Sequence, residues 1–507
     1  MKKGKSILVR IFWIVFFLSM WTILAVAVSK PMNNLIPGRM VIYTLVWVVL
    51  YVGVWFFLCF ANRRYFGFDK LVKRVMPVWI ILFGVALFVV SCILRSEPLT
   101  DYEDVYRAAY ALATGQEVGN WEYFARWNNN VGSMVVLAAL FRLGSPLCGF
   151  MDLYYFVLFV NVLQVMGVAY CVYWLAGKVV QRHSAVASAM ALIVCTLWLP
   201  LWSNTSVFYS DQLSMGAGVF AITLLCKSHE KKHMLIRVGC YVLAGILLGL
   251  GLILKVTTGT IIIALTISIL LHYKLKNILT HWKEIGITAA AFLVILLCFS
   301  LYSRTLPYQK DVYRLKAPVE YWIAIGLGEN GTYSASEDFA IRCLTAENVE
   351  QRREIAREQI VLQAHNFLSL QHLAGKVQHN FGCGEMGASG YLIFPKQESI
   401  LWHWFSVEGK YYWKYSCLST AFFFAVLFLL GMGGLMQAMG KSASTRESIA
   451  FLITAMAFWG LCLFLMLWEA QDKQLYNHSA WMMLSLIFSL NLLEEKLFSK
   501  QKENAYV

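Results

Sequence analysis

Charge is scarce in this chain of 507 residues: only 14% of them are Asp, Glu, Lys or Arg, whereas 59% are hydrophobic. Soluble domains average about 25% charged residues. The mean hydropathy of +0.60 points the same way. This composition excludes an ordinary soluble domain and indicates a polytopic membrane protein.

The motifs of nucleotide chemistry are also missing. The chain has no Walker loop, no Rossmann glycine pattern and no Gly-x-Ser-x-Gly elbow. A nucleotide-powered transporter is therefore not expected, and no nucleotide-sugar domain is visible. If the protein handles sugars, the donor should be linked to a lipid.

The twelve cysteines lack the spacing of metal ligands. Most fall inside apolar runs, where cysteine is a small apolar filler. Cys148, Cys343 and Cys383 fall between such runs. Of these three, Cys343 and Cys383 could form a disulfide.

Long apolar runs dominate the sequence and predict an all-α bundle of about 12 to 13 spans. The twelve clearest runs are Ile7–Val28, Met40–Phe60, Met76–Leu94, Leu153–Trp174, Ala185–Leu201, Asp211–Leu225, Val238–Leu254, Thr257–Leu271, Ile285–Leu301, Tyr415–Met436, Ile449–Trp468 and Ser479–Leu493. A thirteenth, Val131–Leu143, is short, and we expect a helix that does not fully cross.

The net charge of +14 lies in short loops rather than on one soluble face. Such loops stay cytoplasmic, and no nucleic-acid partner is expected. We therefore expect a multi-pass plasma-membrane protein with an uncleaved first span and both termini in the cytoplasm. The acidic and polar loops then lie on the exoplasmic face: Arg95–Asn130, Ser203–Ser210, Arg304–Lys414 and Glu469–His478.

Four regions follow from this layout: N-terminal spans (1–94), a membrane core that contains the first exoplasmic loop (95–303), an exoplasmic insert (304–414) and C-terminal spans with a cytoplasmic tail (415–507). Within the insert, Thr345–Val377 has a helical pattern. Gly382, Cys383 and Gly384 should end that helix.

The loop Thr100–Tyr106 places several carboxylates next to a membrane surface, where acids are rare and usually functional. On a helix, Asp101 and Asp104 share one face, with Glu103 beside them. One carboxylate could be a general base for a hydroxyl nucleophile. Asp101 and Asp104 could instead hold a divalent cation such as Mg²⁺ or Mn²⁺, although no cofactor is required. The alternative is a solvated loop with interfacial tyrosines.

Three further polar groups should lie on the same face. Asp211, after Tyr209 and Ser210, is either a second functional acid or an ordinary first-turn acid of a helix capped by Ser210. Lys255 is a lone base between two apolar runs; it either holds a phosphate or snorkels. Lys473, in the loop before the last run, is another candidate for a phosphate.

The segments Leu99–Gly115, Tyr123–Gly132, Tyr209–Asp211 and Leu254–Lys255 resemble the GT-C superfamily of integral membrane glycosyltransferases, in its bacterial type. These enzymes use a polyprenyl-phosphate sugar and act on the exoplasmic face. The resemblance covers about Met76–Leu301. It departs where relatives often have Pro in place of Asn128, and where many have Arg near Lys473.

The resemblance implies an inverting hexosyltransferase of cell-envelope biogenesis with a glycan, lipid or protein acceptor. Asp101 would be the catalytic base and Asp211 its helper. The expected substrate-binding residues are Glu103, Asp104, Tyr106, Tyr209, Lys255 and Lys473. A transporter or flippase for a lipid-linked saccharide, or a glycan polymerase, is the alternative.

Overall fold

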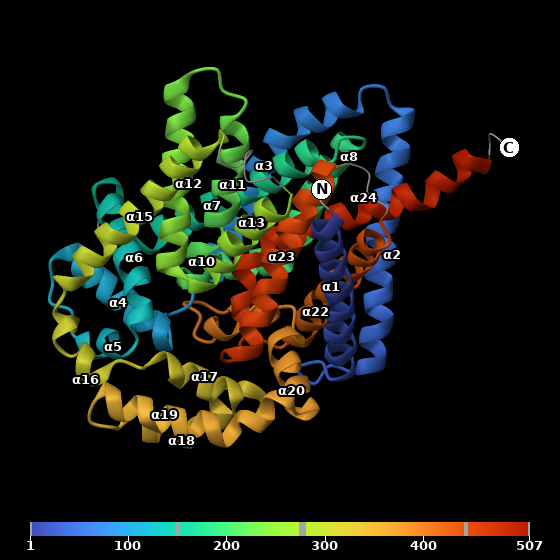
Figure 1. The fold of residues 1–507 in the computed structure, drawn as a ribbon. Coiled ribbons are helices and arrows are strands. Elements are labelled where there is room, and N and C mark those ends of the chain that lie inside the picture. The colour runs from blue at the N-terminus through green and yellow to red at the C-terminus, as the bar shows by residue number, and fades with distance from the viewer. Residues whose placement is uncertain (1–2, 149–152, 273–279, 441–444, 505–507) are drawn as a thin grey trace.

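Helices form the whole regular framework of the chain (Figure 1). The computed structural model describes residues 3–148, 153–272, 280–440 and 445–504. Across those residues the extended pairing is confined to an isolated antiparallel bridge between Ser96 and Pro395. The predicted class, an all-α polytopic membrane protein, is confirmed.

Within the described ranges, nine helices are long and apolar enough to cross a membrane. They are α1 (Lys3–Ser29), α2 (Pro37–Arg64), α3 (Phe68–Ile93), α6 (Val131–Cys148), α7 (Leu153–Val179), α12 (Met234–Leu254), α15 (Trp282–Arg304), α22 (Tyr412–Ala438) and α23 (Thr445–Leu467). Shorter apolar helices α8 (Ser184–Leu197) and α13 (Gly259–His272), together with α24 (Ser479–Asn504), complete the bundle.

The sequence predicted that the run Asp211–Leu225 is one span, and this prediction is wrong. It divides into α10 (Ser210–Ser214) and α11 (Ala217–Ser228). The amide of Gln164 donates to the backbone carbonyls of Gln212 (2.9 Å) and Leu213 (3.2 Å) at the break. Broken backbone inside a bundle is tolerated where such a partner satisfies it. The break lets Asp211 face other polar groups.

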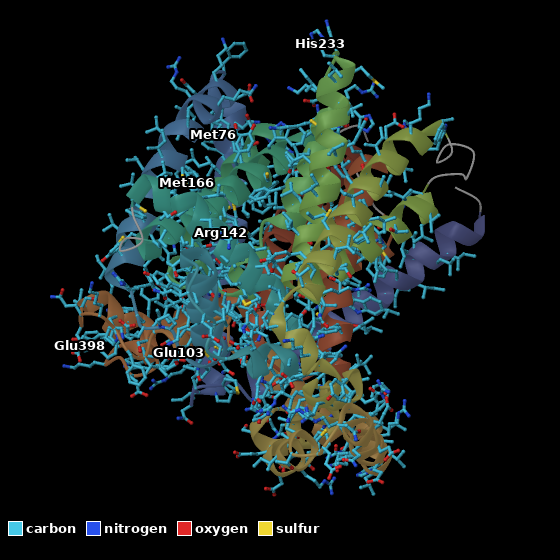
Figure 2. All side chains as sticks on the ribbon, turned by 90° about the vertical axis from the view of Figure 1, so that its left-hand side faces the viewer. Met76, Glu103, Arg142, Met166, His233 and Glu398 are labelled. Atoms are coloured by element: carbon cyan, nitrogen blue, oxygen red, sulfur yellow. The ribbon has the colours of Figure 1, made fainter. Side chains whose placement is uncertain are left out.

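The two ends of the bundle carry different polar groups. At one end, Glu494 of α24 pairs with Arg63 (2.8 Å) and His183 (3.1 Å). The loop before α12 lies at this end, and the helices of the segment 304–414 lie at the other (Figure 1). Figure 2 likewise separates His233 from Glu103 and Glu398. The basic loop before α12 and the insert therefore occupy opposite ends.

Helix α6 contains the short run Val131–Leu143. Asn130, just before α6, bonds to Tyr209. Tyr154, near the start of α7, donates to the carbonyl of Ser96, which follows α3. Helix α6 packs along α4 (Thr100–Thr114). Since α6 has the length and composition of a span, its incomplete crossing stays a prediction.

The insert is a helical layer with its own small core. Its main helices are α16 (Val312–Leu315), α17 (Val319–Leu327), α18 (Glu337–Leu344), α19 (Val349–Gln363), α20 (Leu370–Phe381) and α21 (Ile400–Phe405). The predicted single helix Thr345–Val377 is wrong, because α19 ends at Gln363 and α20 begins after Ser369 caps it. The end of α20 before Gly382 is as predicted.

The suggested disulfide between Cys343 and Cys383 is also wrong. Both cysteines are free and buried. Cys343 contacts the carbonyl of Arg352 inside the insert, whereas Cys383 lies beside Asn33, which follows α1. Packing places the two thiols in different layers.

Candidate functional site

The acidic segment forms helix α4, which begins at a strained residue. Thr100 has φ +50°, a value that is unfavourable for a β-branched side chain. Strain of this kind costs about 1–3 kcal/mol and clusters at functional sites. Asp101 follows in the first turn, and Gly115 (φ +74°) ends the helix in the left-handed conformation. The backbone therefore fixes Asp101 at the start of α4.

A chain of hydrogen bonds orients Asp101. The hydroxyl of Tyr123 donates to Asp101 Oδ1 (2.7 Å), and Asn130 Nδ2 donates to the Tyr123 hydroxyl (2.5 Å). The hydroxyl of Tyr209 donates to Asn130 Oδ1 (2.9 Å). These bonds connect the start of α4 with α5 (Trp121–Arg126), η1 (Asn128–Asn130) and the segment before α10. Asp101 is partly exposed, so its carboxylate can meet a substrate while the chain holds it.

Asp211 and Lys255 form an ion pair (2.9 Å), with Asp211 1% and Lys255 17% exposed. Lys255 caps the end of α12, so the two side chains meet between α10 and α12. Asp211 Oδ1 is buried without a partner. Ser210 makes no helix cap, which removes the simple capping explanation for this motif. A buried, half-satisfied carboxylate is costly, so it marks a site.

Lys473 supplies a second cation from η9 (Asp472–His478). Its ammonium donates to the Tyr391 hydroxyl (3.3 Å) and lies over the rings of Tyr209 and Tyr391. Burial lowers the pKa of Lys473, but Tyr391, Asp211 and Asp101 more than offset that effect and leave the pKa raised. Lys473 therefore stays a cation close to both acids.

The sequence did not single out Glu469 as a site residue, although it lies in the same loop as Lys473. Its side chain is 6% exposed. Burial raises the pKa of Glu469, and its charge interacts with Lys473, Asp101 and Lys255. Tyr123, Asn130 and Tyr391 were likewise missed, because tyrosine and asparagine are common in interfacial loops. Their convergence is a property of the fold.

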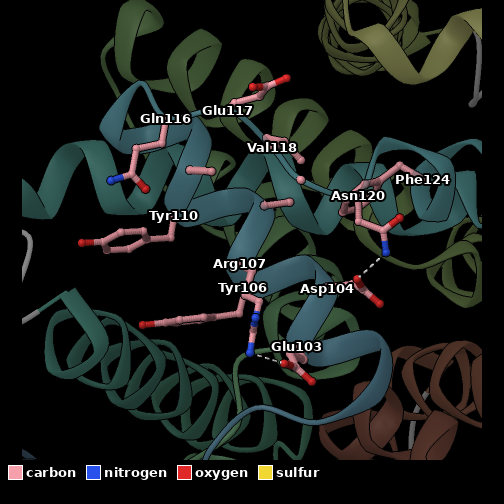
Figure 3. A pocket seen from close by; sticks show the side chains of 13 residues that line it. Glu103, Asp104, Tyr106, Arg107, Tyr110, Gln116, Glu117, Val118, Asn120 and Phe124 are labelled. Carbon is pink, nitrogen blue, oxygen red and sulfur yellow. Dashed lines mark hydrogen bonds and ion pairs between the residues drawn. The ribbon is translucent and has the colours of Figure 1, made fainter.

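The structure thus brings together five of the predicted residues: Asp101, Asp211, Tyr209, Lys255 and Lys473. Three others do not join them. Glu103, Asp104 and Tyr106 line a separate cavity of about 640 Å³ (Figure 3). Glu103 pairs with Arg107 (2.5 Å), and Asp104 accepts from Asn120 (2.9 Å).

The predicted cation at Asp101 and Asp104 stays a prediction. Asp101 accepts a hydrogen bond from Tyr123 and Asp104 accepts one from Asn120, which leaves each carboxylate a second oxygen. In the described part of the chain, the one group of three or more acid, His or Cys ligands is Cys59, His183 and Glu494, at the other end of the bundle.

No protein-family model and no curated protein matches the chain. Among solved structures, it is similar to the oligosaccharyltransferase AglB from Archaeoglobus fulgidus, in complex with an inhibitory peptide and a dolichol-phosphate. The TM-score is 0.41 at 14% identity, covering 85% of this chain. The chain spans about half of that enzyme, 52% of its length.

The chain is also similar to ArnT from Cupriavidus metallidurans, bound to undecaprenyl phosphate. Here the TM-score is 0.34 at 12% identity, over 83% of this chain and 77% of the other. The first of these structures holds a dolichol-phosphate and the second an undecaprenyl phosphate. At these scores the likeness concerns the course of the backbone alone, so the function must come from the site.

Proposed function

We propose that this multi-pass membrane protein transfers a sugar from a polyprenyl-phosphate donor to a hydroxyl of a cell-surface glycan, lipid or protein. The reaction takes place on the exoplasmic face of the plasma membrane. The observation that carries the proposal is the convergence of Asp101, Asp211, Lys255 and Lys473 from four distant segments at one end of the bundle.

Asp101 is the general base. Its Oδ1 is occupied by the Tyr123 hydroxyl, which leaves Oδ2 for the acceptor hydroxyl. As the acceptor oxygen attacks the anomeric carbon, its proton passes to Asp101 and the bond from that carbon to the phosphate oxygen breaks. Direct displacement inverts the anomeric configuration. A positioned base of this kind contributes about a hundredfold to ten-thousandfold in rate.

The two lysines stabilise the leaving polyprenyl phosphate. Lys473 is held as a cation, and Lys255 is the more exposed member of its ion pair. Negative charge grows on the phosphate oxygen as the glycosidic bond breaks, and fixed cations in a site of low dielectric favour that charge. Asp211 positions Lys255 and has almost no exposed surface from which to contact the acceptor.

The test is sugar transfer by purified protein in nanodiscs, with a panel of radiolabelled undecaprenyl-phosphate hexoses and cell-envelope glycans as acceptors. Asp101→Asn keeps the size of the side chain and removes the base. We expect transfer to fall at least about a hundredfold, with the folded fraction unchanged.

Asp338→Asn, at an exposed position in α18, is the matched control, and Asp104→Asn tests the neighbouring carboxylate, one helical turn away from Asp101. Loss of transfer in Asp104→Asn with full activity in Asp101→Asn would move the base to Asp104. Full activity in both variants would overturn the general-base mechanism. If the unmodified protein moved the donor across the bilayer without transferring its sugar, the transporter alternative would replace the proposed function.

A further inference from the structure

The cavity beside α4 is separate from the cluster around Asp101, and its lining differs in kind (Figure 3). Its wall residues come from α4, from the loop that follows, and from α5. They are Glu103, Asp104, Tyr106, Arg107, Tyr110, Gln116, Glu117, Asn120 and Phe124, with smaller residues between them. No residue of the insert contributes. The volume of about 640 Å³ is that of a small-ligand site.

The charge of this wall argues against a phosphate. The lining includes three carboxylates, Glu103, Asp104 and Glu117, and one guanidinium, Arg107. Arg107 is itself neutralised by Glu103 at 2.5 Å. A phosphate placed here would meet net negative charge, whereas Lys255 and Lys473 offer it cations elsewhere. The polyprenyl-phosphate end of the donor therefore does not belong in this cavity.

The same wall suits a hydroxyl-rich ligand. Carboxylates and the amides of Gln116 and Asn120 accept and donate hydrogen bonds. Tyr106 and Tyr110, four residues apart on α4, project their rings to the same side (Figure 3), where both contact Phe141. The carboxylates and amides of the wall are therefore the groups that the hydroxyls of a sugar can use.

The cavity is also coupled to the catalytic carboxylate. Asn120 holds Asp104 at 2.9 Å and caps α5, whose Tyr123 holds Asp101. Asp104 lies three residues from Asp101, a rise of about 4.5 Å along the helix. Burial raises the pKa of Asp104, and the bond from Asn120 opposes that rise.

We propose that this cavity binds the non-acidic saccharide part of the acceptor and so delivers its hydroxyl to Asp101. Its role as an acceptor subsite rests on the proposed function, but saccharide binding by the cavity is measurable without any transfer. The acceptor is then a glycan or glycolipid whose nearest sugar units carry no phosphate and no carboxylate.

The test is equilibrium dialysis of the full chain in nanodiscs with tritiated chitotetraose, its fully deacetylated amine form, and tetragalacturonic acid. Gly119 lines the cavity, and a Cβ added there meets no atom within 4 Å. Gly119→Trp therefore adds a large side chain to the wall of the cavity without a clash at Cβ, and Gln116→Ala removes one exposed polar contact. We expect one or both non-acidic probes to bind, at least tenfold more weakly in Gly119→Trp.

Gly286→Trp is the matched control, since a Cβ at Gly286 in α15 also meets no atom within 4 Å. It should bind as the unmodified protein does. Failure of both non-acidic probes to bind, equal loss in Gly286→Trp, or preference for the acidic probe would each overturn the proposal. Saccharide binding that survives in a protein without transfer activity would refute the proposed function and leave the cavity as a saccharide site.

Discussion

At the scale of single residues, the pair of Asp211 and Lys255 shows why the function of a charge depends on its burial. Asp211 is 1% exposed, and its second oxygen has no partner. Removing one member of a buried pair leaves the other uncompensated, at a cost of about 3–5 kcal/mol. Lys255 therefore stabilises Asp211, and under the proposed function it also presents a cation to the donor.

A pair of variants separates these roles. Lys255→Met should lower both thermal stability and transfer. The double variant Asp211→Asn with Lys255→Met should recover most of the stability, because no charge remains unpaired, yet transfer should stay reduced at least tenfold. Thermal unfolding and donor kinetics measure the two effects. Recovery of transfer in the double variant would contradict the phosphate role.

Asp472 provides a pH-dependent prediction. Burial raises its pKa from 3.8 to about 7, with the charge of Glu385 as the next cause. The folded protein therefore holds a proton that the unfolded chain has released between about pH 4 and pH 7. Because the folded state binds more protons in that window, this group lowers stability as pH rises through it.

Asp472→Asn removes this penalty. We expect the variant to match the unmodified protein near pH 4 and to gain on the order of 4 kcal/mol by about pH 8. Thermal unfolding across this range measures the gain. Asp338→Asn, at an exposed position in α18, should give no comparable pH-dependent gain. A gain at pH 4 as large as at pH 8 would contradict the assignment.

At the scale of elements, helix α20 fixes the loop that carries Glu469 and Lys473. The buried ammonium of Lys376 donates to the carbonyls of Gly326 (2.8 Å) and Trp468 (2.6 Å). Burial lowers its pKa to about 7. Asn380 accepts from the backbone of Gln471 (2.9 Å). The insert thus holds the loop of the second cation, in addition to covering that end of the bundle.

Asn380→Ala tests this coupling. It leaves the Gln471 amide without its acceptor, at a cost of about 1–3 kcal/mol. We expect faster hydrogen exchange at Gln471 and reduced transfer, measured by mass spectrometry and by donor kinetics. Asn366→Ala is the control, since Asn366 donates to the carbonyl of Leu327 within the insert. Equal effects of the two variants on the loop would show that Asn380 has no specific positioning role.

At the scale of the whole molecule, the arrangement of the two ends supports one orientation in the membrane. The insert and the candidate site share an end, and the loop before α12 lies at the other (Figure 1). Basic loops stay cytoplasmic, so the site should be exoplasmic. The orientation itself remains a prediction.

Cysteine labelling in intact cells tests it. In a background with the exposed Cys226 and Cys298 replaced by serine, Ser334→Cys in the insert should react with a membrane-impermeant maleimide. Lys231→Cys should react only after the cells are opened. Reversed labelling would place the site in the cytoplasm and would exclude sugar transfer on the exoplasmic face.

The sequence by itself determined the class of this protein and the residue types of its site. Apolar runs are read locally, because each helix must satisfy its own backbone in a bilayer. Acids and lone bases stand out because charge is costly in a membrane, so the sequence alone makes Asp101, Asp211, Lys255 and Lys473 candidates.

Only the tertiary structure decided how those residues are shared between sites. Asp101 and Asp104 are one helical turn apart. Asp101 accepts a hydrogen bond from Tyr123 and lies in the cluster with the lysines, whereas Asp104 accepts one from Asn120 and lines the cavity. The break between α10 and α11, and the course of α6 along α4, also depend on contacts between distant segments. The hydrophobic periodicity of the sequence does not predict such contacts, because they form between segments that are distant in sequence.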